Sequence, residues 1–79
     1  MPFVNIKIAR EGDGATAEQK AAVMRGVTDV LVRVLKKNPD STFVVIEEID
    51  PDNWGVAGDS VTAVRQRAAG GASATSKPR

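Results

Sequence analysis

The first residues of the chain alternate between apolar and polar positions. Val4, Ile6 and Ile8 fall on one side of an extended segment, and the residues between them fall on the other. A period of two is typical of a β-strand with one buried face. The pattern therefore predicts a strand over residues 3–9, almost at the start of the chain.

A longer period follows. Between positions 17 and 35 apolar residues recur at steps of three and four, with charged residues between them, as in an amphipathic helix. Thr16 and Gln19 have the spacing of a capping box, in which Thr16 caps the helix and Gln19 reaches back to it. We predict a helix of about 20 residues that begins at Thr16. The segment around Pro39 is expected to end it, because proline cannot continue a helix.

Residues 42–49 are rich in β-branched and apolar side chains and predict a second strand of the kind that is covered on both faces. Strand, helix and strand form a βαβ unit, which should be parallel and right-handed. The fold class is therefore α/β, with a short carboxy-terminal hairpin or turn after the loop 50–59. Residues 60–67 fit a short strand or a last helical turn. We assign residues 1–69 to one domain and residues 70–79 to a disordered tail of small and polar residues.

The predicted βαβ unit has a stability problem. One helix covers one face of a two-stranded sheet, which leaves the other face and both edges open. A chain of 79 residues with 4% aromatic residues has little material for a core of its own. We therefore expect a homo-oligomer in which copies cover these surfaces. A marginally stable monomer is the alternative.

Composition restricts the possible chemistry. Cysteine and histidine are both absent, which removes disulfides, thiol nucleophiles, imidazole catalysis and the usual zinc and haem ligands. We expect neither a metal nor a cofactor. A net charge of +1 differs from the basic surface of a nucleic-acid-binding protein. The sequence shows no apolar run that could span a bilayer and no signal-peptide pattern, so we expect a soluble, cytoplasmic protein with no membrane or nucleic-acid partner.

Proline directly follows the initiator methionine. Removal of Met1 would leave Pro2 as the amino terminus, with a secondary amine. The pKa of an ordinary α-amino group is about 7.7–8.0, and burial or nearby positive charge lowers it. Such an amine can act as a general base or attack a carbonyl group. The alternative is a Met-Pro opening without function.

Four features occur in a fixed order along the chain: Pro2 before an alternating strand, Glu11-Gly12 in a loop, Glu18-Gln19-Lys20 at a helix start, and Trp54-Gly55-Val56-Ala57-Gly58 in a later loop. With these features, residues 2–67 resemble the 4-oxalocrotonate tautomerase family. The resemblance implies a homohexamer, arranged as a trimer of dimers, with each site built from more than one subunit. It also implies enol–keto tautomerisation of a small carboxylate, a 2-oxo or 2-hydroxydienoic acid, as in the catabolism of aromatic compounds.

The resemblance also implies roles for single residues. Pro2 matches the general base of the family. Trp54 matches an aromatic residue that forms an apolar wall of the pocket, and Ser41 matches a substrate-binding serine before the second strand. Structural alternatives remain open, since Trp54 could fill a subunit interface and Ser41 could serve only in the turn.

The arginines depart from the family pattern. The loop arginine of the family follows Glu-Gly, but here Asp13 follows that pair and Arg10 precedes it. Phe43 occupies the position of the second-strand arginine. Because a guanidinium binds a carboxylate in a bidentate manner and stabilises developing negative charge, Arg10 is the candidate substrate-binding cation. The alternative is a loop arginine without function, and Arg65 and Arg67 are further candidates that their spacing does not favour.

Two other functions remain open. Some members of the wider superfamily hydrate or dehalogenate unsaturated acids with an acidic residue that activates water, and Glu47 or Glu48 could take that role. The structural alternative is that these residues end the strand and pair with helix lysines. A non-catalytic oligomeric accessory protein, which lost the second-strand arginine, is the third hypothesis.

Overall fold

The computed structural model describes residues 1–70, which form two compact units. The first unit comprises Met1–Ile8 and Asp13–Glu48, and the second comprises Ala9–Gly12 and the chain from Ile49 onward. The tail expected over residues 70–79 lies, except for Gly70, outside the described residues. Neither helix found up to residue 70 is long and apolar enough to cross a membrane.

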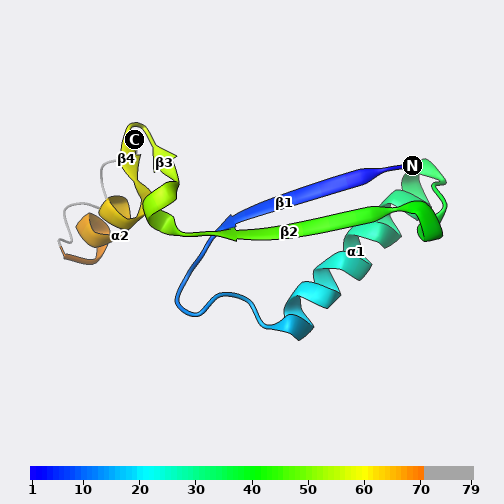
Figure 1. The fold of residues 1–79 in the computed structure, drawn as a ribbon, viewed down its shortest axis with the longest axis horizontal. Coiled ribbons are helices and arrows are strands. Elements are labelled where there is room, and N and C mark those ends of the chain that lie inside the picture. The colour runs from blue at the N-terminus through cyan, green and yellow to red at the C-terminus, as the bar shows by residue number, and fades with distance from the viewer. Residues whose placement is uncertain (71–79) are drawn as a thin grey trace. The chain divides into compact units, whose positions relative to one another are not determined.

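Two strands form a parallel sheet, β1 (Phe3–Ala9) and β2 (Phe43–Ile49) (Figure 1). At one end the Phe43 amide donates to the Pro2 carbonyl at 3.0 Å, and at the other the Arg10 amide donates to the Ile49 carbonyl at 2.8 Å. The pairing therefore extends over the full length of both strands. Both predicted strands and their parallel βαβ arrangement are confirmed.

The connection between the strands is α1 (Ala17–Leu35), which begins as the sequence predicts. The Gln19 amide donates to Thr16 Oγ1 at 3.0 Å, and the Thr16 amide donates to Gln19 Oε1 at 2.9 Å. Both bonds of the capping box are therefore present, and they satisfy two amides that the helix itself leaves without partners.

The end of α1 agrees with the predicted length of about 20 residues, but its cause differs from the expected one. Lys36 adopts the left-handed conformation with φ 58°, and its amide donates to the Leu31 carbonyl, so the helix stops before the proline is reached. Asn38 is extended, with φ −79° and ψ 123°, because the following proline ring excludes the helical region. The short 3₁₀ helix η1 (Pro39–Ser41) then leads into β2.

The sheet has one covered and one open face. Val44, Ile46 and Glu48 alternate with the exposed residues of β2 and lie on the side of α1, where Glu48 pairs with Lys20. The other side, here called the open face, carries Phe3, Asn5 and Lys7 of β1 and Phe43, Val45 and Glu47 of β2.

Large apolar side chains remain exposed in the isolated chain. On the open face Phe3 is 63% exposed, Phe43 49% and Val45 39%, and five apolar residues of α1 are exposed as well: Val23, Met24, Val30, Val34 and Leu35. None of residues 1–70 is fully buried. The described chain therefore lacks a closed core, as expected of a subunit that is completed by other copies.

The second unit contains the hairpin and the second helix. After η2 (Pro51–Asn53), strands β3 (Gly55–Val56) and β4 (Asp59–Ser60) pair in antiparallel orientation. Both residues between the strands, Ala57 and Gly58, have positive φ, which is the geometry of a two-residue hairpin turn. The predicted hairpin is thus confirmed.

Residues 61–70 are helical and form α2 (Val61–Gly70). The structure therefore selects the helix from the two alternatives left open for residues 60–67, and extends it. The Val61 amide donates to the Trp54 carbonyl at 2.8 Å, which joins the first turn of α2 to the residue before the hairpin.

Glu48 holds the loop before α1 in place. Its carboxylate accepts from the Ala15 amide at 2.8 Å and lies 2.8 Å from Lys20 Nζ. Gly14 packs against the same carboxylate at φ +85°, and a Cβ at this position would lie 2.6 Å from Glu48 Oε2. Glu48 could move away from such a Cβ only by giving up these two interactions.

Gly14→Ala should therefore destabilise the chain more than Gly12→Ala. Gly12 has φ +56°, and no atom lies within 4 Å of the position that a Cβ would take there. Its substitution therefore tests the backbone conformation alone and should lower the free energy of unfolding by about 1 kcal/mol. Gly14→Ala adds the contact with Glu48 and should cost about 3 kcal/mol. Urea denaturation of both variants measures the difference, and equal losses would contradict the anchoring role of Glu48.

Candidate active site

Pro2 lies immediately before β1 and is half-buried. Its carbonyl accepts the hydrogen bond from the Phe43 amide, whereas its nitrogen carries the peptide bond to Met1, which is 83% exposed. Proline has no N–H to donate to a sheet, so the nitrogen takes no part in strand pairing. Removal of Met1 would leave the hydrogen bond to Phe43 intact.

Ser41 is the last residue of η1 and lies close to the start of β2. Its hydroxyl donates to the Asn38 carbonyl at 3.4 Å, which is long for a hydroxyl donor, while Thr42 Oγ1 donates to the same carbonyl at 2.8 Å. Ser41 precedes by two residues the amide that binds the Pro2 carbonyl. The first unit thus places Ser41 and Pro2 at the same end of the sheet.

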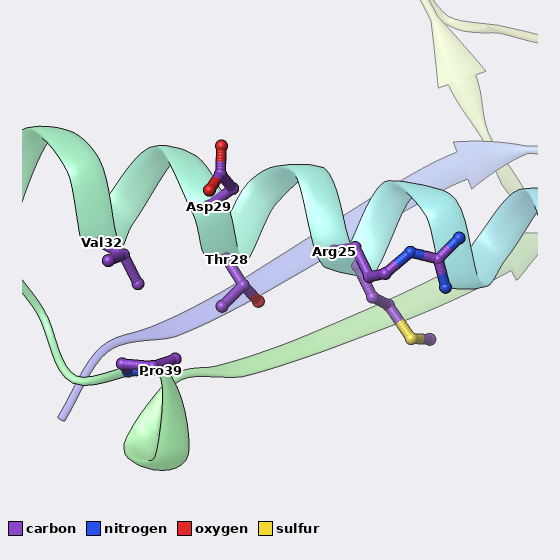
Figure 2. A pocket seen from close by; sticks show the side chains of 6 residues that line it. Arg25, Thr28, Asp29, Val32 and Pro39 are labelled. Carbon is purple, nitrogen blue, oxygen red and sulfur yellow. The ribbon is translucent and has the colours of Figure 1, made fainter.

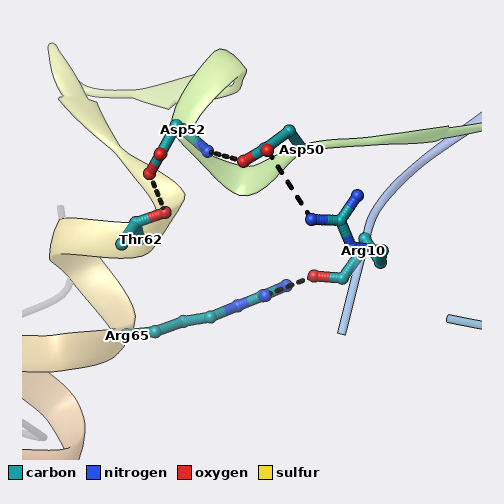
Figure 3. A network of polar contacts seen from close by, with 5 residues as sticks. All are labelled: Arg10, Asp50, Asp52, Thr62 and Arg65. Atoms are coloured by element: carbon teal, nitrogen blue, oxygen red, sulfur yellow. Dashed lines mark hydrogen bonds and ion pairs between the residues drawn. The ribbon is translucent and has the colours of Figure 1, made fainter. Parts of the chain in front are cut away.

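Arg10 directly follows β1 in the second unit (Figure 3). Its Nη2 lies 3.6 Å from Asp50 Oδ2, and both side chains are about half exposed. Asp50 also accepts from the Asp52 amide at 2.9 Å through Oδ1, which fixes the carboxylate at the start of η2. Arg10 therefore forms a long ion pair with Asp50, whose carboxylate is held in place by a backbone hydrogen bond.

The backbone of Arg10 has a partner that the sequence did not reveal. Arg65 Nη1 of α2 donates to the Arg10 carbonyl at 2.6 Å (Figure 3). The two residues are 55 positions apart, and no local spacing predicts such a contact. Arg65, considered above only as a further candidate for substrate binding, lies against its own chain.

Trp54 is half-buried and belongs to the same second unit. Its amide donates to the Pro51 carbonyl at 3.4 Å, and its carbonyl accepts from the Val61 amide at 2.8 Å. The backbone of Trp54 is therefore held where η2, the hairpin and α2 meet.

The four predicted site residues fall into two pairs. Pro2 and Ser41 belong to the first unit, and Arg10 and Trp54 belong to the second. Along the chain, β1 separates Pro2 from Arg10, and a strand of seven residues is about 23 Å long at about 3.3 Å per residue.

The two acidic residues of β2 point to opposite faces and have different partners. Glu48 pairs with a helix lysine, Lys20, as expected, but the partner of Glu47 is Lys7 of β1. Asn5 Nδ2 also donates to Glu47 Oε1, at 2.9 Å. Within residues 1–70 no group of acidic or other ligating side chains is arranged to hold a metal ion.

An open hollow of about 410 Å³ lies along α1 and beside η1 (Figure 2). It is lined by Met24, Arg25, Thr28, Asp29, Val32 and Pro39. None of the predicted site residues lines it.

The pairing of Glu47 predicts a pH dependence of stability. The hydrogen bond from Lys7, then the one from Asn5 and the charge of Lys7, hold the pKa of Glu47 below its ordinary value of 4.5. The stabilisation is therefore complete above about pH 4.5 and is lost as the pH falls through the lowered pKa of the folded state.

Glu47→Gln should consequently lower the melting temperature at pH 7, and this loss should diminish as the pH is lowered from 4.5 toward 3. Thermal unfolding of both proteins between these pH values tests this expectation. Lys7→Gln removes the main cause of the lowered pKa of Glu47. In this variant the melting temperature should therefore depend less on pH in the acidic range. A constant difference between Glu47→Gln and the wild type at all pH values would contradict the assignment.

Comparison with known proteins agrees with the fold. The family model described as "Tautomerase enzyme" matches residues 2–64. "Probable tautomerase K2" of Dickeya dadantii (strain 3937) is 56% identical over 68 residues, which cover 86% of this chain and 98% of the relative. The crystal structure of DmpI from Helicobacter pylori is 48% identical, with a TM-score of 0.78, and the match covers 82% of this chain and 97% of that chain. A structure from a study of the 4-oxalocrotonate tautomerase isozymes of Methylibium petroleiphilum is 32% identical, with a TM-score of 0.70 and coverage of 80% and 97%.

Proposed function

Because the chain belongs to the tautomerase family, we propose that it is an isomerase that moves a proton within a 2-oxo or 2-hydroxydienoic acid. The general base is the secondary amine of Pro2 after removal of Met1. The amine takes the proton of the 2-hydroxyl group and returns a proton to carbon 3 or carbon 5, so the enol becomes a ketone and the proton balance is unchanged. The observation that carries the proposal is the position of Pro2, whose nitrogen is not used by the sheet.

Aromatic residues next to Pro2 in the chain and in the strand pairing would favour a neutral amine once the proposed assembly covers them. The neighbouring residue Phe3 and the strand partner Phe43 both carry aromatic side chains, and each is about half exposed or more in the isolated chain. Apolar surroundings disfavour a protonated amine and lower its pKa, which keeps the base available near neutral pH.

Arg10 is the proposed cation for the substrate carboxylate. Its long ion pair with Asp50, at 3.6 Å, can be exchanged for a bidentate contact with a carboxylate, which is the geometry that a guanidinium favours. Trp54 is proposed as an apolar wall of the pocket and Ser41 as a hydrogen-bond donor to the substrate.

A shared site in a homo-oligomer reconciles these roles. Pro2 and Arg10 flank a seven-residue strand, so we propose that they meet in a site to which more than one copy contributes. The exposed apolar side chains of the open face and of α1 provide the surface for such an assembly. We propose a homohexamer.

Hydration of unsaturated acids by Glu47 or Glu48 is less well supported. A residue that activates water needs a pKa near the working pH. Glu48 binds the Ala15 amide and Lys20, and hydrogen bonds from Lys7 and Asn5 lower the pKa of Glu47. Both carboxylates therefore have structural partners, which favours tautomerisation.

Pro2→Ala should lower kcat/KM for ketonisation of 2-hydroxymuconate about 100-fold or more, because it replaces the rigid secondary amine. Absorbance follows the reaction, and intact mass of each protein establishes whether Met1 has been removed. The melting temperature serves as the control for folding. Full activity in protein that retains Met1 would contradict the mechanism.

Other substrates separate the alternatives. Turnover of 3-haloacrylates, but not of 2-hydroxymuconate or phenylenolpyruvate, would favour the hydratase hypothesis. Absence of proton exchange with every 2-oxo acid, together with indifference to Pro2→Ala, would favour the accessory protein.

Val45→Asp should disrupt the assembly, because it places a charge on the apolar part of the open face that other copies are proposed to cover. Native mass spectrometry should show six times the chain mass of 8.3 kDa for the wild type and smaller species for the variant. Val45→Thr keeps the branched shape without a charge and should retain the hexamer. A wild-type protein that stays monomeric at micromolar concentration would overturn the proposed assembly.

A further inference from the structure

The two arginines of α2 have different partners. Arg65 Nη1 donates to the Arg10 carbonyl at 2.6 Å, and Nη2 donates to the Ala9 carbonyl at 3.3 Å and lies 3.7 Å from Glu11 Oε2. Arg67 Nη2 instead lies 3.1 Å from Asp59 Oδ2. The Arg65 side chain thus contacts residues 9–11 at the end of β1, whereas Arg67 forms an ion pair with the hairpin strand β4.

The geometry uses the particular shape of a guanidinium. Its nitrogens form a rigid planar fork that can donate to two acceptors at once, here two consecutive carbonyl groups. Hydrogen bonds from a charged donor are stronger than those between neutral groups. On the other side of the same residue, the Arg10 amide donates to the Ile49 carbonyl at 2.8 Å. The backbone of Arg10 is therefore fixed at both its amide and its carbonyl.

The side chain of Arg10 is held much less firmly. Its guanidinium forms a half-exposed ion pair with Asp50 at 3.6 Å, and exposed pairs of this kind contribute little free energy. A fixed backbone with a loosely held guanidinium is the arrangement expected of a group that exchanges one carboxylate for another.

The helix that carries Arg65, α2, is itself held by a hydrogen bond to η2 (Figure 3). Thr62 of α2 donates through Oγ1 to Asp52 Oδ1, and the Asp52 amide donates to Asp50. Because the Asp50 carboxylate also faces Arg10, α2, η2 and the segment after β1 form one connected polar network. The position of Arg65 is thereby tied to the position of the acid that pairs with Arg10.

We propose that Arg65 is a positioning residue, which fixes the backbone of Arg10 and so determines where the Arg10 guanidinium meets the substrate carboxylate. The proposal rests on the proposed function in that it takes Arg10 as the carboxylate-binding group. Since Arg65 acts through Arg10 and not through Pro2, its loss should weaken substrate binding and leave the proton-transfer step largely unchanged.

The test compares wild type, Arg65→Gln, Arg10→Gln and the double variant with 2-hydroxymuconate. Arg65→Gln should raise KM about tenfold with kcat within about twofold of the wild type. In the Arg10→Gln background the same substitution should raise KM no further, because residues that act through one another are not additive. Arg65→Lys keeps the charge but loses the fork and should restore only a small part of the loss.

Arg67→Gln is the matched control. It removes the same charge from the same helix together with one ion pair to an acid, but its partner is Asp59, so KM should stay within about twofold of the wild type. Hydrogen exchange at the Arg10 amide, which donates to the Ile49 carbonyl, gives a second readout that needs no activity. Exchange there should become faster in Arg65→Gln and stay unchanged in Arg67→Gln.

The outcomes separate the two levels of the proposal. Equal rises of KM in Arg65→Gln and Arg67→Gln, or additive effects in the double variant, would overturn the role of Arg65 while the proposed function stands. Unchanged exchange at the Arg10 amide in Arg65→Gln would overturn it as well. A wild-type protein that turns over no 2-hydroxydienoic acid would overturn the proposed function, and with it any role of Arg65 toward a substrate.

Discussion

A parallel sheet of two strands can be covered on only one face by the helix that connects them, and this limit governs the molecule. The open face has an apolar part around Phe3, Phe43 and Val45 and a polar part in which Lys7 and Asn5 hold Glu47. Pro2 lies at the apolar end, since its carbonyl binds the Phe43 amide. This exposed apolar surface thus adjoins the proposed base, and the proposed assembly would both cover the surface and exclude water from the amine.

The segment between β1 and α1 is held by opposite chemical means in the two units. In the first unit a carboxylate, that of Glu48, accepts from the Ala15 amide. In the second unit a guanidinium, that of Arg65, donates to the Ala9 and Arg10 carbonyls. Glycines give the segment the positive φ values that a short loop needs, and the two charged side chains restrict the freedom that glycines bring. These contacts restrict the conformation of the segment, which suits the proposed role of Arg10 in binding the substrate carboxylate.

Local features of the fold were predictable because their causes lie within a few residues of one another. The alternation of β1 and the Thr16–Gln19 capping box depend on neighbouring side chains, and both occur as expected. The end of α1 was harder to predict, because Lys36 adopts a left-handed conformation that lysine has no intrinsic tendency to form. The helical state of α2 depends on tertiary contacts such as the one between Thr62 and Asp52.

In the candidate site, too, features with local causes were predictable and features that depend on tertiary contacts were not. Pro2 could be singled out because its chemistry depends only on its place next to Met1. Arg10 could be singled out as a cation, but its partners Asp50 and Arg65 lie 40 or more positions away in a chain without an internal pattern that links them. Side-chain pairs of this kind depend on the tertiary path of the backbone, and no spacing of residues along the sequence predicts them.

The hydrogen bonding of Pro2 separates folding from maturation. The residue contributes a carbonyl to the sheet, and its nitrogen contributes nothing. An unprocessed chain can therefore fold with the same strand pairing while its nitrogen is an amide without basicity. In the proposed mechanism, removal of the methionine would convert this amide into a basic secondary amine without changing the strand pairing.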